Sequence, residues 1–181
     1  MLNDLANLES YFQEEKSLFA IREDYRKATG YVKLDAGLIS FLAKYGPWLE
    51  VGAGSGELAE SIRQAGSRVI ATDTQDWWLF EGWDQKKTIK ADGVRAARLL
   101  KYANVGLLSA WPPYRDEWIT EAVRQLPIGR LFGYLGETEG GCTGSDSLFE
   151  LLGHDFKKVD EYHYPQFYGL HDYAMIFRRF K

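Results

Sequence analysis

Three glycines at alternate positions are the residues of this chain whose spacing first suggests chemistry. They lie in the stretch LEVGAGSGEL, residues 49–58, directly after a short apolar segment. Glycine inside a regular element costs roughly 0.5–1 kcal/mol relative to alanine, so three together need a reason. A backbone without Cβ atoms can approach a ligand closely, and the N–H groups that begin the next helix favour an anion. The pattern indicates either a ligand-binding loop or a tight turn.

Two aspartates follow the next two apolar segments. Asp73 ends RVIATD, and Asp92 ends KKTIKAD. In a parallel sheet, ligands bind at the carboxyl ends of the strands near the point where the strand order reverses, and an acid after the second strand can accept hydrogen bonds from ribose hydroxyls. An aspartate after a strand is also a common helix N-cap. Both interpretations therefore apply to each aspartate.

The spacing of the glycines argues against a dinucleotide. The dinucleotide fingerprint is G-x-G-x-x-G, and the position of its third glycine holds Glu57 here. A carboxylate beside a pyrophosphate would repel it, which disfavours a nicotinamide-dependent dehydrogenase. The loop is better suited to a ligand that carries a small carboxylate, a ribose and an adenine.

Hydrophobic periodicity predicts the elements that must position these residues. Helices are expected over residues 3–27, 35–45, 57–65, 93–102, 117–126 and 147–152, and strands at WLEVGAG, RVIATD, KKTIKAD, NVGLLSAW, GRLFGYLGE, KKVDEYHY and YAMIFRRF. The alternation predicts an α/β fold, a doubly wound and mostly parallel seven-stranded sheet with an antiparallel C-terminal edge pair. Residues 1–46 are expected to form an N-terminal helical extension or lid, and residues 47–181 the ligand-binding domain.

Length and composition limit the classes of function. The chain has 181 residues and a formal net charge of −4, whereas a protein that grips nucleic acid by its phosphates is usually basic. Cys142 is the single cysteine, which excludes an intrachain disulfide and a multi-cysteine metal site and favours a cytoplasmic setting. No histidine–carboxylate spacing predicts a metal site. No apolar run reaches membrane-spanning length, so we expect no membrane association.

The motifs LEVGAGSGEL, IATD and KADG resemble the first three motifs of the class I S-adenosylmethionine-dependent methyltransferases. The terminal antiparallel pair is also similar to that family, so the resemblance covers roughly residues 47–180, with its specific motifs in 49–93. It implies S-adenosylmethionine as the cofactor. By this resemblance, the methionine part of the cofactor would run along Gly52, Ala53 and Gly54, and its ammonium group would lie near Glu50. Asp73 would hold the ribose. The adenine would contact Asp92 and the backbone of Gly93. Thr74 and Ser109 are assigned to the same cofactor site.

The loop LLSAWPPYRDEW after the fourth strand borders the transferred methyl group in this family. Its Trp111-Pro-Pro-Tyr114 resembles the D/N-P-P-Y/F/W motif of methyltransferases that modify amino groups of nucleobases or glutamine. This resemblance implies substrate contacts from Trp111, Pro112 and Tyr114, and a catalytic role for Tyr114, which would stack on a flat acceptor. Trp111 cannot accept a hydrogen bond from the target amine, so the amine-reading half of the motif is absent. A proline turn with core aromatic residues is the alternative.

Three further segments supply candidates around the acceptor. His171, in PQFYGLHD between the last two strands, would be a catalytic base oriented by Asp172 and a substrate-binding residue, or a surface histidine with a local hydrogen bond. Tyr31, at the end of the N-terminal helical region, would contact the substrate as part of a lid. Trp77 or Trp78 would cover the adenine face, or belong to a surface aromatic cluster.

These observations predict a cytoplasmic S-adenosylmethionine-dependent methyltransferase that acts on a small or nucleotide-like planar acceptor. One alternative is a nucleic-acid methyltransferase that obtains recognition from a partner subunit, and we expect nucleic-acid binding only with such a partner. The other is an S-adenosylmethionine-binding module without catalysis.

Overall fold

The computed structural model describes residues 2–76 and 88–181, and its elements lie close to their predicted positions. The helices are α1 (Leu2–Thr29), α2 (Ala36–Tyr45), α3 (Glu57–Gln64), α4 (Gly93–Ala97), η2 (Arg98–Tyr102, a 3-10 helix), α5 (Trp118–Arg124) and α6 (Asp146–Asp155). The strands are β1 (Trp48–Val51), β2 (Val69–Asp73), β3 (Ile89–Lys90), β4 (Gly106–Ala110), β5 (Leu131–Gly136), β6 (Phe156–Tyr162) and β7 (Tyr173–Arg179).

The strands form a seven-stranded sheet in the order β3-β2-β1-β4-β5-β7-β6. Neighbours from β3 to β5 pair in parallel, whereas β7 runs antiparallel to both β5 and β6. The predicted doubly wound sheet with an antiparallel C-terminal edge pair is confirmed. The strand order reverses between β1 and β4, so a ligand is expected where the carboxyl ends of these two strands meet.

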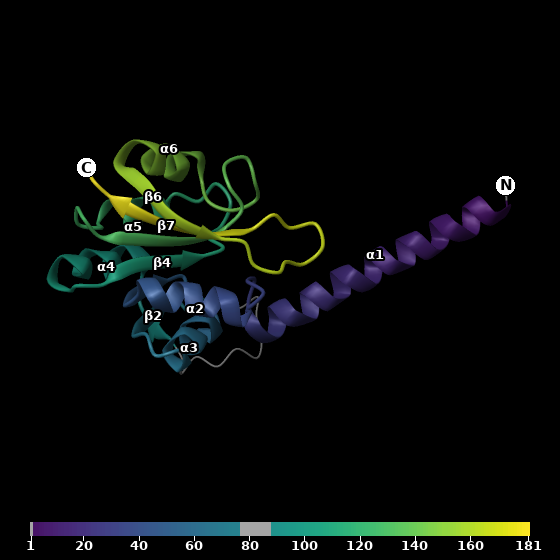
Figure 1. Ribbon diagram of the computed structural model, residues 1–181, viewed down its shortest axis with the longest axis horizontal. Helices are drawn as coiled ribbons and strands as arrows, with labels where there is room; N and C mark the ends of the chain where they lie inside the picture. Colours follow the sequence, from purple (N-terminus) through teal and green to yellow (C-terminus); the bar gives the residue numbers. More distant parts are fainter. Residues whose placement is uncertain (1, 77–87) are drawn as a thin grey trace.

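Helices cover both faces of the sheet (Figure 1). On one face, Leu38 and Leu42 of α2 and Ile62 of α3 pack with Trp48 of β1 in one buried cluster. On the other face, α4, α5 and α6 enclose a second cluster that includes Ile119. Strand β1 is buried along its whole length, as expected for a central parallel strand with helices on both sides.

The segment after β3 differs from its prediction. The sequence predicts one helix over residues 93–102, whereas the α-helix α4 ends at Ala97 and the tighter 3-10 helix η2 follows. Leu99 and Tyr102 remain largely exposed, and Leu100 is the buried residue of η2. Because η2 lacks an apolar stripe of helical spacing, little packing energy is available to hold another α-helical turn against the sheet.

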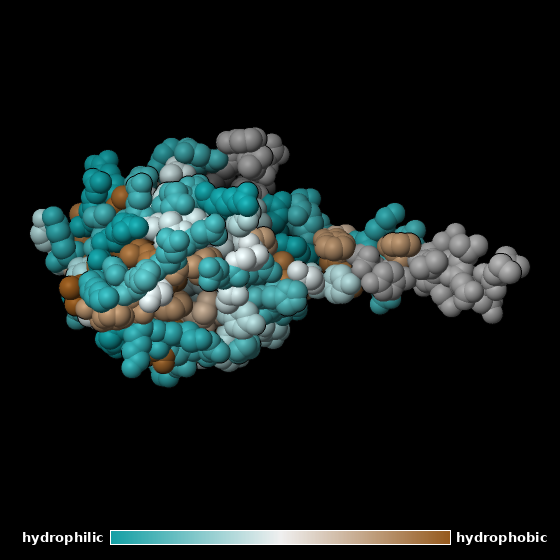
Figure 2. Space-filling view, turned by 90° about the horizontal axis from the view of Figure 1, so that it is seen from above, coloured by the Kyte–Doolittle hydropathy of each residue, from teal (hydrophilic) through white to brown (hydrophobic). Residues whose placement is uncertain are grey.

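Helix α1 leaves the body of the molecule and projects away from it (Figure 1). Phe12, Phe19 and Ile21 are at least half exposed, and Figure 2 shows apolar surface on this projecting helix. In its C-terminal part the helix is tied to the segment that follows, where the Tyr25 hydroxyl accepts a hydrogen bond of 2.9 Å from the N–H of Leu34. The division into an extension over 1–46 and a domain over 47–181 stays a prediction.

Among residues 2–76 and 88–181, no helix combines the length and the apolar character that a membrane crossing requires.

Candidate active site

The glycine loop between β1 and α3 is a turn that only glycine forms readily. Gly52, Gly54 and Gly56 have φ angles of 67°, 54° and 77°, in the left-handed region that residues with a Cβ rarely adopt. A hydrogen bond of 3.0 Å from the N–H of Ala53 to the carbonyl of Thr72 ties the loop to β2. The turn geometry therefore accounts for the glycines, and it also leaves the loop backbone open toward a ligand.

Asp73, at the end of β2, holds the glycine loop in place. Its Oδ2 accepts a hydrogen bond of 2.9 Å from the N–H of Gly54, and its Oδ1 accepts one of 2.8 Å from the N–H of Gln75. Each carboxylate oxygen has two acceptor sites. The carboxylate can therefore support the loop and still accept hydrogen bonds from a ligand.

Glu50 is a buried carboxylate beside the same loop. It is 1% exposed, and burial raises the pKa of its carboxyl to about 8, with Arg63 opposing the shift and Asp73 adding to it. Among the described residues, its Oε2 has no hydrogen-bond partner. Glu50 lines a cavity of about 50 Å³ together with residues 29–32 and the glycine loop. A buried, unpartnered carboxylate that borders a cavity indicates a ligand with a positive charge.

Asp92 and Gly93 begin α4 at the end of β3. Asp92 is the N-cap of the helix, since its Oδ1 accepts a hydrogen bond of 2.8 Å from the N–H of Arg95. Gly93 is buried against the indole of Trp118, and a Cβ on Gly93 would lie 2.6 Å from Cζ3 of that ring. A Cβ on Gly52 would lie 3.0 Å from the far edge of the same indole. The Trp118 indole therefore packs against both Gly93 and Gly52 and forms the floor of the site.

A cavity of about 610 Å³ joins these strand ends at the carboxyl edge of the sheet. It gathers the predicted residues Tyr31, Gly52, Gly54, Asp73, Thr74, Asp92, Gly93, Ser109, Trp111 and Pro112. The small cavity beside Glu50 and Ala53 shares Tyr31 and two of the glycines with it, so the two hollows adjoin. The volume suits a small-molecule site.

Sequence reasoning missed five residues of the cavity wall: Ala91, Ala110, Pro113, Asp116 and Trp118. Trp118 contributes most, because its ring supports two glycines. Nothing in its local pattern separates it from the other tryptophans of the chain. Its position depends on the packing of α5 beside α4, a contact between separate helices.

Trp111 stands at the end of β4 in an unusual backbone conformation, with φ 53°. Its backbone N–H donates to the carbonyl of Leu135 (2.8 Å), and its Nε1 donates to Oδ2 of Asp172 (3.0 Å). Its ring stacks on that of Tyr31, with centroids 5.1 Å apart and planes 8° apart. The guanidinium carbon of Arg22 lies 5.4 Å from the Trp111 centroid. The cavity therefore ends in an aromatic wall with a cation beside it.

Tyr114 and His171 lie outside the linings of both hollows. Tyr114 is half exposed, with the guanidinium of Arg115 4.8 Å from its ring centroid. The His171 side chain is 83% exposed, and its backbone N–H donates to Glu137 at 3.2 Å. The catalytic and substrate-binding roles assigned to Tyr114 and His171 stay predictions.

Asp172, the neighbour of His171, is the buried member of that pair. It is 2% exposed. Burial raises the pKa of its carboxyl, and the hydrogen bond from Trp111 opposes this while the charge of Glu137 adds to it. In the described part of the chain its Oδ1 has no hydrogen-bond partner. The side chain of Gln166 brackets the residue by accepting from the N–H of Asp172 (2.7 Å) and donating to its carbonyl. The carboxylate is thus held behind Trp111.

The single cysteine and the two tryptophans Trp77 and Trp78 are the other residues that the sequence analysis named. Burial and the nearby Glu137 raise the pKa of the Cys142 thiol to about 11, so it stays protonated near neutral pH and is a poor nucleophile. Trp77 and Trp78 lie outside the described residues, and their proposed contact with the adenine stays a prediction. Among the described residues no cluster of three or more potential metal ligands is found.

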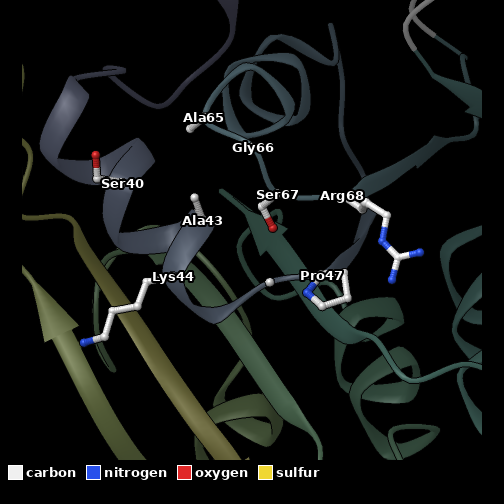
Figure 3. Close-up of a pocket in the computed structure, with 9 residues that line it drawn as sticks. Ser40, Ala43, Lys44, Pro47, Ala65, Gly66, Ser67 and Arg68 are labelled. Atoms are coloured by element: carbon white, nitrogen blue, oxygen red, sulfur yellow. The ribbon is translucent and has the colours of Figure 1, made fainter.

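A second hollow, of about 570 Å³, lies at the opposite edge of the sheet (Figure 3). Pro47 and Ser67, which line it, come just before β1 and β2. Its two cations diverge in Figure 3: Lys44 forms an ion pair of 3.3 Å with Asp160, and Arg68 points to the other side. None of the predicted site residues lines this hollow.

No protein family model and no curated protein matches the chain, whereas many solved structures do. It is similar to a 1,6-didemethyltoxoflavin N1-methyltransferase from Burkholderia thailandensis with its bound substrate and S-adenosylhomocysteine (TM-score 0.53, 20% identity, 97% of this chain and 87% of that one). It is also similar to a magnesium protoporphyrin IX methyltransferase from Synechocystis with bound S-adenosylhomocysteine (TM-score 0.53, 13% identity, 90% and 99% coverage). A third is a putative tRNA (m1A22) methyltransferase from Streptococcus pneumoniae with S-adenosylmethionine (TM-score 0.52, 14% identity, 82% and 74% coverage).

The fold is that of the class I S-adenosylmethionine-dependent methyltransferases. At these identities the likeness concerns the fold. The names of these three proteins give acceptors as different as 1,6-didemethyltoxoflavin, magnesium protoporphyrin IX and, for the putative enzyme, tRNA. The choice of acceptor must therefore be argued from the side chains of this chain, since one fold serves many functions.

Proposed function

We propose that the protein is an S-adenosylmethionine-dependent methyltransferase that acts on a small or nucleotide-like planar acceptor. The observation that carries the proposal is the pair of carboxylates at the ends of two adjacent strands. Glu50 is buried without a hydrogen-bond partner among the described residues, and Asp73 supports the glycine loop beside the cavity. A ligand with an ammonium group would supply the partner that the Glu50 carboxylate lacks, and its ribose hydroxyls would donate further hydrogen bonds to Asp73.

The residues around the cavity fit this cofactor part by part. Glu50 would meet the methionine ammonium, and the backbone of the glycine loop would run along the methionine chain. Asp73 and Thr74 would hold the ribose, whereas Asp92 and the Gly93 backbone would meet the adenine, with Trp118 beneath them. When bound, the cofactor supplies a methyl group on a positively charged sulfur.

The protein's own contribution is alignment and exclusion of water. Aromatic faces attract a cation, and Trp111 offers such a face on the cavity wall. The loop that carries Trp111 is held by backbone hydrogen bonds to the next loop, from Gly144 N–H to Pro112 O (3.0 Å) and from Arg115 N–H to Gly144 O (2.9 Å). Fixed walls of this kind hold two reactants at reacting distance, which supplies much of the rate enhancement in a displacement.

The size and the walls of the cavity favour a small, flat acceptor. About 610 Å³ must hold both the cofactor and the acceptor, and a stacked aromatic wall suits a planar ring. The net charge of −4 opposes binding of an extended nucleic acid by this chain alone. A nucleotide-like small molecule avoids that repulsion.

Calorimetric titration with S-adenosylmethionine and, separately, with NAD tests the proposal. We expect saturable binding of S-adenosylmethionine only, and a loss of about 100-fold or more in affinity for Asp73→Ala, since both the loop anchor and the ribose acceptor disappear. Asp146→Ala, at an exposed position in the first turn of α6, is the matched control and should bind like the wild type.

The same titration separates the alternatives. No binding by the wild type, or equal binding by Asp73→Ala, would contradict the proposal. Binding without methyl transfer to any small planar compound, but with transfer to RNA or DNA once a partner subunit is added, would favour the nucleic-acid alternative.

A further inference from the structure

Two aromatic rings of different origin form one wall of the cavity. Trp111 and Tyr31 stack on each other, and both line the cavity. Trp111 follows β4 in the middle of the sheet, whereas Tyr31 lies in the connector between α1 and α2. The wall therefore joins a ring carried by the sheet to a ring carried by the N-terminal segment.

Trp111 is the fixed member of this pair. It is held through its backbone N–H by Leu135 and through its indole N–H by Asp172, and its left-handed φ is the kind of local strain that clusters at ligand sites. Tyr31 follows Gly30, which has a φ of 121°, in a connector without helix or strand. Tyr31 is held by Arg26 of α1, whose Nη1 donates to the Tyr31 hydroxyl (3.4 Å) and whose guanidinium carbon lies 5.4 Å from the ring centroid. These contacts belong to the N-terminal segment, so a flat ligand can take the place of the Tyr31 ring without disturbing the sheet.

Arg22 adds a positive charge beside this wall. Within the described residues it forms no ion pair, whereas Arg26, one helical turn later, is paired with Glu23. The charge of Arg22 acts on the buried Asp172, which accepts the hydrogen bond from the Trp111 indole, but burial raises the pKa of that carboxyl, which weakens its negative charge. In a chain of net charge −4, an arginine without an ion partner at an aromatic wall is a site for an anion.

The ionisable residues of the cavity favour an acceptor that has already lost its proton. The described lining contains Tyr31, Asp73, Asp92 and Asp116, and no histidine, lysine or cysteine. Two of these aspartates belong to the proposed cofactor end. Asp116 lies exposed near the acceptor end, where solvent screens its repulsion of an anion. An anionic acceptor needs no general base from the protein.

We propose that the acceptor is a planar heteroaromatic anion that stacks on Trp111 in the place of Tyr31 and pairs its charge with Arg22. The inference rests on the proposed function, because the wall acts as an acceptor platform only if the cofactor fills the adjoining part of the cavity. Trp111 supplies the flat surface and Arg22 selects the charge. Asp172 is a positioning residue that holds the indole.

Two purines with the same ring system but different charge test whether the site prefers an anion. Urate is an anion near neutral pH, and hypoxanthine is neutral there. Protein saturated with S-adenosylhomocysteine is titrated with each compound by calorimetry. We expect urate to bind at least about tenfold more tightly, as one charge-assisted contact would give, and Arg22→Gln to reduce that ratio to about twofold. Tyr31→Ala should tighten urate binding several-fold, because the platform no longer has to be uncovered.

Lys16→Gln is the matched control, because it removes the same charge from an exposed position of α1, and it should keep the wild-type ratio. Equal affinity for the two purines, no binding of urate, or an unchanged ratio in Arg22→Gln would overturn the inference. The preceding titration with S-adenosylhomocysteine tests the proposed function separately. A complex that forms with S-adenosylhomocysteine but shows no preference for urate refutes the acceptor class and leaves the methyltransferase proposal standing.

Discussion

The cavity at the carboxyl edge of the sheet and the hollow at its amino edge have similar volumes, about 610 and 570 Å³, yet they differ in chemistry. The first gathers glycine turns, strand-end aspartates and an aromatic wall, with the buried Glu50 next to it. The second is lined by small and exposed residues, and its Lys44 is already paired with Asp160.

The difference shows that volume alone does not find a site. A buried carboxylate without a hydrogen-bond partner weakens the folded state, so its presence at one edge indicates a ligand that compensates for it. Among the described residues that line the amino-edge hollow, no buried polar side-chain atom lacks a hydrogen-bond partner. Substitutions at the carboxyl edge should therefore change stability or cofactor affinity, whereas substitutions at the amino edge should change neither by much. The following predictions run from the largest expected effect to the smallest.

Glu50→Gln should change the pH dependence of stability. Below pH 4.5 the Glu50 carboxyl is protonated in both the folded and the unfolded chain. Between pH 4.5 and about 8 the unfolded chain ionises while the folded chain keeps its proton, so wild-type stability falls as the pH rises through this window. We expect a loss on the order of 3–5 kcal/mol that the glutamine variant does not share. Urea unfolding across the window measures it, and parallel curves for the two proteins would contradict the assignment.

The same substitution should weaken cofactor binding. Glutamine cannot pair with the methionine ammonium as a carboxylate does, so we expect affinity for S-adenosylmethionine to fall about 30- to 100-fold. Ser67→Ala at the amino-edge hollow is the control and should leave the affinity unchanged. A variant that is more stable and binds the cofactor as tightly as the wild type would show that the buried carboxylate serves no ligand.

Gly93→Ala tests the contact between α4 and the indole of Trp118. The added Cβ would lie 2.6 Å from the ring, so the indole must shift, and we expect a loss of about 1–3 kcal/mol in the free energy of unfolding. Gly153→Ala is the matched control within α6, where a Cβ meets no atom within 4 Å, and it should stabilise by about 0.5–1 kcal/mol. Denaturant unfolding measures the stability of both variants. Equal changes in the free energy of unfolding would show that Gly93 does not pack tightly against the Trp118 indole.

Asp172→Leu should leave the indole N–H of Trp111 without its acceptor. We expect a loss of about 1 kcal/mol in stability relative to Asp172→Asn, which retains an acceptor oxygen. Tryptophan fluorescence should report a more mobile indole in the leucine variant alone. Identical spectra for the two variants would show that the 3.0 Å hydrogen bond does not position the ring.

Arg68→Ala at the amino-edge hollow should have the smallest effect. The side chain is exposed, so the change in stability should stay within about 0.5 kcal/mol. Cofactor affinity should not change in calorimetry. A marked loss of cofactor affinity would indicate that the cofactor binds at the amino edge, and would contradict the assignment of the site to the carboxyl edge.

Local sequence patterns were sufficient to predict the architecture and to place the glycine loop and the strand-end aspartates at one edge of the sheet. Apolar runs broken by glycine and proline predicted the strands and most helix bounds, because burial sets these periods within a few residues of chain. The motif spacing predicted the loop at Gly52 and Gly54 and the position of Asp73 at the end of β2, since parallel strands bring their carboxyl ends to one edge. These features depend on short-range geometry.

Only the tertiary structure decided the aromatic wall of the cavity. Tyr31 and Trp111 meet because the connector after α1 crosses the end of β4, and no local pattern contains that contact. Asp172 is buried while His171 is exposed, because Asp172 accepts from the Trp111 indole and its backbone is held by the Gln166 side chain. Side-chain contacts between distant segments depend on how layers pack. The sequence alone therefore determined the fold and the loops at the carboxyl edge of the sheet, and the packing determined the aromatic wall of the cavity.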